Sequence, residues 1–176
     1  MPICAFCSTE EIWQVMMYPN PFIHTNTTGG GALACSAAIA AINITLRDRL
    51  WEQAAAKGDY IISRLKSLAA QYPQIYESTL APHVTPGQST PLGNPRGMGQ
   101  SAGVTGRGLL IGMHFKDAAV GYKVAAGLFK RGVLVAGTLT SAHTIRIEPP
   151  LIITYEQIDT LLNRLSDTLV DVSKTS

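Results

Sequence analysis

The sequence is poor in charge. Only 15% of its 176 residues are Asp, Glu, Lys or Arg, and the 14 basic against 12 acidic residues leave a net charge of +2. The basic residues are scattered along the chain and form no run. Nucleic-acid binding needs Lys and Arg gathered into a patch, so the sequence argues against a nucleic-acid partner.

Long hydrophobic runs and cysteines are also scarce. No apolar stretch approaches the roughly 18 residues of a membrane-spanning helix, although 46% of the residues are hydrophobic. The first residues lack the basic segment of a secretory signal. Three cysteines, an odd number, make no disulfide framework. We therefore expect a globular protein of ordinary domain size that is cytoplasmic and has no membrane partner.

Apolar spacing predicts helices and strands in a mixed order. Apolar residues that recur every three or four positions indicate helices, and short apolar runs closed by glycine or proline indicate strands. The expected helices cover residues 9–17, 31–46, 50–72, 118–132 and 155–169. The expected strands cover residues 108–115, 133–137 and 143–150. This order predicts an α+β fold preceded by a long helix pair.

Local patterns predict helix starts and one long insertion. Ser8 and Glu11 have capping-box spacing before the first helix, and Thr154 and Gln157 have it before the last. Residues 80–103 contain four prolines and five glycines but few large apolar side chains. Such a segment has little to bury, so we expect a flexible insertion there.

The segment "HTNTTGGGALAC", residues 24–35, places threonines and three glycines directly before a helix. The amides of a helix N-terminus are unpaired and lie at the positive end of the helix dipole, so glycines there let an anion approach the backbone. Thr25, Thr27 and Thr28 could add hydroxyl donors. The spacing fits neither a Walker loop nor a dinucleotide fingerprint, so from the residues alone a plain loop is the simpler interpretation.

Arg146 lies in the middle of the apolar stretch "TIRIEPPL". Glu148, two residues later, falls on the same face of a strand. An arginine at such a position is costly unless it is paired. Two interpretations are open: an internal ion pair with Glu148 or a neighbouring strand, or a guanidinium fork for a substrate carboxylate.

The remaining reactive residues give weaker signals. Cys4 and Cys7 form a CxxC pair that could bind zinc with His24 or Cys35, or act as a redox pair. A zinc site normally needs two pairs of ligands that are each close in sequence. Cys35 is more simply a small core residue, so we expect no metal site. The four histidines are dispersed, and the six lysines lie where solvated side chains are ordinary. The residues alone therefore predict no catalytic base or nucleophile.

Several motifs together resemble a known family. "MPI.A", "HT.T.GG..LACSAAIAAIN", "GRGLLIG" and "GVLVAGTL…TIRIEPPL" occur in an order similar to the C-terminal part of class III aminotransferases, with the putrescine aminotransferase branch nearest. The resemblance covers almost the whole chain except residues 80–103. It implies a small C-terminal domain of the fold type I pyridoxal-phosphate transferase fold over residues 48–176. Residues 1–47 would be a remnant of the large domain and the interdomain helix, with the glycine-rich phosphate segment.

The resemblance also implies roles for individual residues. Thr27, with Thr28 and Gly29, would bind the phosphate of pyridoxal 5'-phosphate across the interface of a homodimer. Arg146 would bind the α-carboxylate of the amino or oxo acid. The implied reaction moves an amino group from a diamine such as putrescine, or a related ω-amine, to a 2-oxo acid such as 2-oxoglutarate.

The sequence departs from the family pattern at important positions. In the family the lysine that holds the cofactor precedes the "MPI" segment, and none of the six lysines here has a matching context. The resemblance thus implies a fragment without a catalytic residue, and we expect the isolated chain not to transaminate. Thr105 replaces a usual arginine, and Cys4 a common glycine. The alternative is a non-catalytic interaction or dimerisation module left by truncation of such an enzyme.

Overall fold

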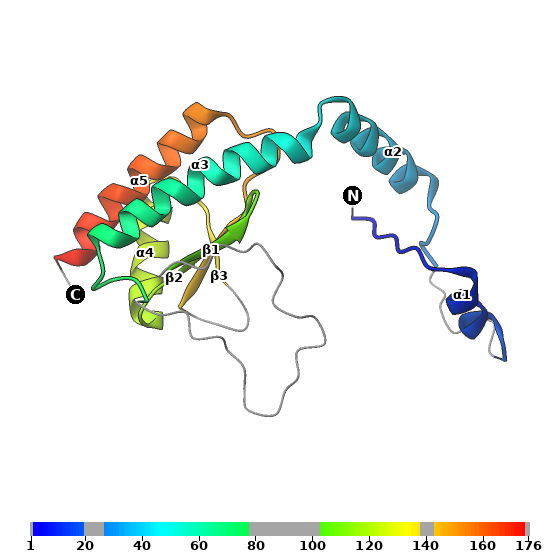
Figure 1. Cartoon of the computed structure of the whole chain (residues 1–176), viewed down its shortest axis with the longest axis horizontal. Helices are drawn as coiled ribbons and strands as arrows, with labels where there is room; N and C mark the ends of the chain where they lie inside the picture. The colour runs from blue at the N-terminus through cyan, green and yellow to red at the C-terminus, as the bar shows by residue number, and fades with distance from the viewer. Residues whose placement is uncertain (1, 20–26, 78–102, 138–142, 175–176) are drawn as a thin grey trace. The chain divides into compact units, whose positions relative to one another are not determined.

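The computed structural model describes residues 2–19, 27–77, 103–137 and 143–174. The chain divides into two compact units, Met1–Arg49 and Leu50–Ser176. Figure 1 shows both, with most of their helices and strands labelled. The expected insertion over residues 80–103 falls almost wholly outside the described residues.

The first unit contains two helices, α1 (Glu10–Met17) and α2 (Ala32–Arg47). Both lie close to the ranges predicted from the sequence, residues 9–17 and 31–46. The capping prediction for α1 is wrong: Thr9, not Ser8, precedes the helix, and no side chain makes a capping hydrogen bond. Glu11 is therefore the second helical residue, one position too early to complete a capping box.

Neither helix of the first unit buries a side chain. Large apolar residues of α2 are exposed, Leu33 by 71% and Ile39 by 61%. Cys35, predicted as a core residue, is only half-buried. The prediction fails because α2 has apolar residues all round, while its own unit supplies no core to cover them.

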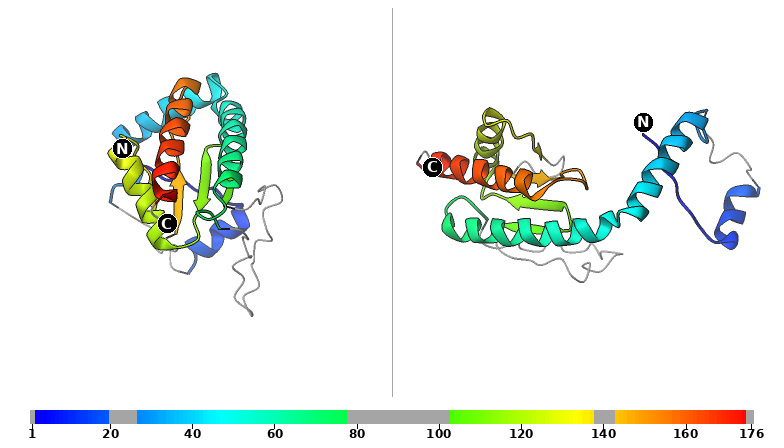
Figure 2. Two further views of the ribbon diagram at one scale, coloured as in Figure 1. Left: turned by 90° about the vertical axis from the view of Figure 1, so that its left-hand side faces the viewer. Right: turned by 90° about the horizontal axis from the view of Figure 1, so that it is seen from above.

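The second unit combines three helices with one antiparallel sheet. Its elements are α3 (Leu50–Gln71), β1 (Val104–Arg107), β2 (Leu110–His114), α4 (Ala118–Lys130), β3 (Ala136–Gly137), β4 (Thr144–Ile147) and α5 (Tyr155–Ser173). The strand order is β1-β2-β4-β3, and every neighbouring pair is antiparallel. The two views of Figure 2 show α3 and α5 running side by side.

The core of this unit lies where the helices meet one face of the sheet. Apolar side chains alternate along the strands, so that one face is buried and the other carries polar residues. The fully buried side chains include Phe115, the largest of them, and residues from all three helices and the sheet: Ile61, Leu65, Ile111, Met113, Val124, Leu128, Ile158, Leu165 and Leu169. Each contributes about 1.5–3 kcal/mol by leaving water.

Close backbone contact joins α3 to the turn between β1 and β2. A Cβ atom on Gly58 would lie 2.1 Å from the Gly108 carbonyl oxygen. Gly108 itself has φ +55°, a left-handed conformation that favours glycine. The pair of glycines therefore sets how closely the helix approaches the sheet.

The structure confirms most of the predicted elements in this unit and corrects their lengths. Thr154 and Gln157 form the predicted capping box at the start of α5, with bonds of 3.3 and 3.0 Å. Strand β1 was not predicted, because "VTGR" has neither apolar alternation nor a run. The strand expected over 133–137 is limited to Ala136–Gly137. The strand expected over 143–150 ends at Ile147, before Pro149, whose nitrogen cannot donate to a ladder.

Candidate cofactor-phosphate and carboxylate sites

The glycine segment forms a turn that leads directly into α2. Residues 27–30 make the turn, Gly30 has φ +73°, and the Gly31 amide donates to the Thr28 carbonyl oxygen at 3.2 Å. Gly31 is the N-cap and, as a glycine, offers no side-chain cap to the first-turn amides. The first turn also carries no acidic residue. The helix thus presents unpaired donors and the positive end of its dipole.

A cavity of about 680 Å³ adjoins this turn within the first unit. Residues 2–4 line one side of it, and residues 28–34 line the other. Thr28 and Gly29, two of the three predicted phosphate residues, are among the lining residues, whereas Thr27 lies in the turn but outside the lining. None of the described residues that line the cavity is acidic, so backbone donors and a hydroxyl here fit a phosphate group.

Arg146 lies on β4, in the second unit, and points away from the apolar core. Its paired neighbours across the sheet are Gly112 on β2 and Ala136 on β3, and these two residues add little side-chain bulk beside the guanidinium. Arg146 Nη1 donates to Glu148 Oε1 at 3.1 Å, and the two side chains are 44% and 37% exposed. The ion-pair interpretation of Arg146 is therefore correct for this structure. An incoming carboxylate would have to compete with Glu148.

A hydrogen-bonded row on the same sheet face was missed by the sequence analysis. His114 Nε2 lies 2.8 Å from the Thr105 hydroxyl, and His114 Nδ1 lies 3.1 Å from the Thr144 hydroxyl. Burial lowers the pKa of the His114 imidazole below its usual value, while nearby Glu77 acts in the opposite direction. The three residues are far apart in sequence, so only the strand register could have indicated the row.

Lys57 contradicts the prediction that the lysines are solvated. It is 8% exposed on α3, and its Nζ donates to Gln53 Oε1 at 3.1 Å and to the Leu151 carbonyl oxygen at 3.5 Å. The long aliphatic stem packs inside while the ammonium finds oxygen partners. Lys57 thus links α3 to the segment that follows β4.

The cysteines give the metal interpretation no support. Cys4 and Cys7 are free and exposed. Among the described residues, no group of three His, Cys, Asp or Glu side chains lies close enough to hold a metal ion. His24, one of the two alternative further ligands, falls outside the described residues. Within the same part of the chain, no helix is both long and apolar enough to cross a bilayer.

The small antiparallel sheet and its helices match a fragment of the fold type I pyridoxal-phosphate aminotransferase fold. The chain is similar to an (S)-enantioselective omega-transaminase from Thermomicrobium roseum, with 26% identity, a TM-score of 0.67 and 93% of this chain covered. It is also similar to the ornithine aminotransferase of Toxoplasma gondii, with 23% identity, a TM-score of 0.68 and 93% coverage.

A third similar structure is the lysine aminotransferase of M. tuberculosis in its internal aldimine form, with 23% identity, a TM-score of 0.57 and 75% coverage. The chain spans only 24%, 32% and 33% of the lysine, ornithine and omega enzymes, respectively. By sequence, residues 1–78 match the model of the class-III aminotransferase family. The match to the family model thus includes the glycine turn and α3. For the residues after 78, the similarity to aminotransferases rests on the comparison of folds.

Proposed function

We propose that this chain is the C-terminal part of a pyridoxal-phosphate-dependent class III aminotransferase. In this proposal it provides the end of the site that binds the cofactor phosphate, through Thr27, Thr28 and Gly29, and the carboxylate-binding Arg146. The observation that carries the proposal is the uncapped start of α2, where a glycine turn adjoins a cavity without acidic lining. This turn lies within the residues that match the family model.

The residues at this turn suit the cofactor's phosphate and not its reactive carbon. Backbone amides and the Thr28 hydroxyl can donate hydrogen bonds to phosphate oxygens. The sequence has no lysine before Lys57, so the first unit supplies no amine to hold the aldehyde. When bound, pyridoxal phosphate supplies an electron sink for the carbon that exchanges its amino group. We propose that a lysine outside this chain completes the site, and that the isolated chain is inactive.

For the substrates we propose a terminal amine and a 2-oxo acid. Lysine and ornithine, in the names of the similar enzymes, both carry a terminal amino group, as does putrescine. Putrescine itself is proposed from the motif resemblance. The oxo acid, such as 2-oxoglutarate, would place its carboxylate on Arg146 and displace Glu148, since one guanidinium edge cannot serve both carboxylates equally.

The phosphate site is tested by comparing pyridoxal phosphate with pyridoxal, which lacks the phosphate. Equilibrium dialysis with the full chain should give at least about ten-fold tighter binding of the phosphorylated form. Thr28→Val should weaken its binding severalfold, because a hydroxyl donor to a charged group is lost. The control is Thr45→Val on α2, whose hydroxyl donates to the Ala41 carbonyl oxygen at 2.8 Å. Equal binding of both compounds would refute the phosphate site.

The exposed apolar surface of the first unit favours a second candidate, a non-catalytic dimerisation module. The residues concerned belong to both helices: Ile12, Val15, Met17, Leu33, Ile39, Ile42 and Leu46. Exposed apolar surface of this extent promotes association. Sedimentation velocity of the full chain tests it: a dimer without affinity for pyridoxal phosphate would favour this function, and a clean monomer would exclude it. The homodimer expected for an aminotransferase would use the same surface.

A further inference from the structure

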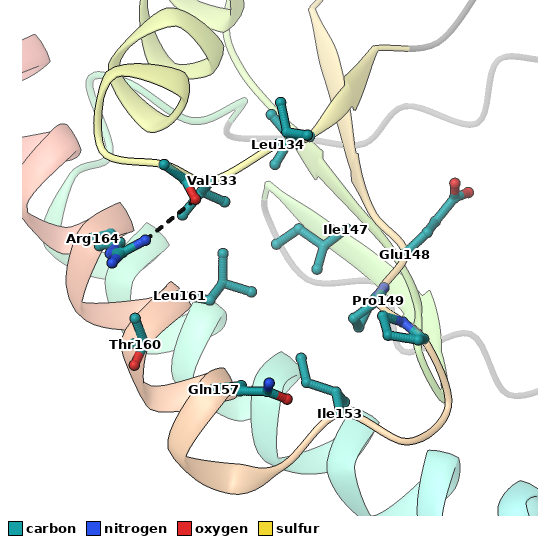
Figure 3. A pocket seen from close by; sticks show the side chains of 13 residues that line it. Val133, Leu134, Ile147, Glu148, Pro149, Ile153, Gln157, Thr160, Leu161 and Arg164 are labelled. Carbon is teal, nitrogen blue, oxygen red and sulfur yellow. Dashed lines mark hydrogen bonds between the residues drawn. The ribbon is translucent and has the colours of Figure 1, made fainter.

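The second unit contains a pocket of about 400 Å³ that neither proposed site uses. It lies between α5, the end of β4 and the segment that follows α4 (Figure 3). Its apolar lining comes from all three segments: Val133, Val135, Ile147, Ile153 and Leu161. Pockets of this size with an apolar lining and few polar groups are the usual form of small-molecule sites.

Arg164 is the one cationic side chain among the described residues that line this pocket. It extends from α5 and is half-buried, and its Nη1 donates to the Gly132 carbonyl oxygen at 3.3 Å, drawn as the dashed line in Figure 3. Among the described residues, Arg164 forms no ion pair. A guanidinium has five N–H donors, so one long bond to a carbonyl leaves most of its capacity for a ligand.

The acidic residue at the rim does not neutralise this charge. Glu148 also lines the pocket, but its carboxylate is bonded to Arg146, and Figure 3 shows it directed away from the other lining side chains. The two polar side chains of α5 that line the pocket are uncharged, Gln157 and Thr160. The pocket therefore offers an apolar lining with a net positive end.

We propose that this pocket binds a small apolar monocarboxylic acid, with its hydrocarbon part on the apolar lining and its carboxylate on Arg164. A cation would be repelled by Arg164, and a phosphorylated metabolite would need more donors than one guanidinium provides. Ile147 lines the pocket from the core side of β4, whereas Arg146 points to the opposite side, because successive strand residues alternate. Arg146 thus lies outside the pocket, and Glu148 at the rim is the residue that the pocket shares with the proposed substrate carboxylate site.

The test uses 4-methylpentanoate and its neutral analogue 4-methylpentanamide as ligands of the full chain in isothermal titration calorimetry. We expect the acid to bind at least ten-fold more tightly than the amide. Arg164→Gln should abolish this preference, because it removes the charge but keeps hydrogen-bonding capacity. The matched control is Arg131→Gln at the C-cap of the neighbouring α4, since Arg131 already pairs with Asp171 and lies outside the pocket.

Three results would overturn the proposal: no binding of 4-methylpentanoate at millimolar concentration, equal binding of acid and amide, or an undiminished preference in Arg164→Gln. The comparison of acid and amide in the unmutated chain needs no variant, so it holds even if Arg164→Gln folds poorly. Arg164→Lys keeps the charge and should retain part of the preference. Arg164 and Arg131 lie outside the phosphate turn, and neither is the proposed carboxylate-binding Arg146. Failure of this test therefore leaves the proposed function untouched.

Discussion

The two units of the chain differ in what holds them together. The second unit has a continuous core in which side chains such as Ile61, Leu165 and Leu169 are fully buried. The first unit has two helices without a buried side chain, and apolar residues such as Leu33 face solvent. One unit is stabilised by its own packing, and the other has apolar surface without a core.

This difference also separates the two proposed sites. Arg146 lies on a strand that the core of the second unit holds rigidly, and its immediate neighbours along β4 are buried. The glycine turn lies in the unit without a core, and its donors are backbone amides. Backbone donors need only the correct chain conformation, which Gly30 and Gly31 allow at little steric cost. A side-chain site, by contrast, needs a packed support.

The largest expected effect comes from truncating a core residue of the second unit. Leu165→Ala should lower the free energy of unfolding by about 2–5 kcal/mol, because it removes buried methyl groups and leaves a cavity. The matched change in the first unit, Ile39→Ala, should alter it by less than about 0.5 kcal/mol. Urea denaturation followed by circular dichroism measures both. Comparable losses for the two variants would mean that the first unit has a core of its own.

The glycine contact between α3 and the β1–β2 turn gives the next effect. Gly58→Ala should destabilise the protein by about 1–3 kcal/mol through overpacking, despite the better helix propensity of alanine. The control is Gly137→Ala, where a Cβ would meet no atom within 4 Å. Thermal unfolding of both variants measures the difference. A stabilised Gly58→Ala protein would show that α3 can move away from the sheet without loss.

A smaller effect is expected at the start of α5. Thr154→Ala removes a capping bond to the Gln157 amide and should cost about 1 kcal/mol. Ser63→Ala is the control, since that hydroxyl bonds only to the Tyr60 carbonyl oxygen within its own helix. The midpoints of urea denaturation should separate the two variants. If they coincide, the capping box adds nothing to the stability of the unit.

The smallest expected effect is a pH dependence from His114. Because burial lowers the folded-state pKa, the unfolded chain binds the proton more readily, so this contribution to stability is complete above about pH 6.5. It should be lost as the pH falls below that value towards the folded-state pKa. Urea midpoints of the unmutated chain and His114→Gln, measured from pH 8 to pH 5, test this. An identical slope in both proteins would assign the pH dependence to other groups.

Periodicity predicted the helices well because each carries apolar residues three and four positions apart. The capping box at Thr154 could be predicted because both of its partners are local in sequence. Strand β1 could not be predicted: its "VTGR" sequence has little intrinsic preference, and it is a strand because Val104 to Arg107 pair with residues 110–113. The short β3 likewise depends on its pairing with β4.

The candidate sites were predictable to different degrees. The glycine turn is local, so the segment itself indicated both the turn and the helix start. The residues of "TIRIEPPL" left two interpretations of Arg146, and the structure shows the ion pair with Glu148. The His114 row and the Arg164 pocket depend on residues brought together by sheet register and helix packing. No short-range pattern contains that information.

The most direct test of the account is reduction of the full chain with borohydride in the presence of pyridoxal phosphate, followed by peptide mapping and an assay of putrescine turnover. In the proposed function the chain binds the cofactor's phosphate but supplies no lysine for its aldehyde. We therefore expect no stoichiometric label on any single lysine and no turnover. Stoichiometric labelling of one specific lysine, together with turnover, would contradict it.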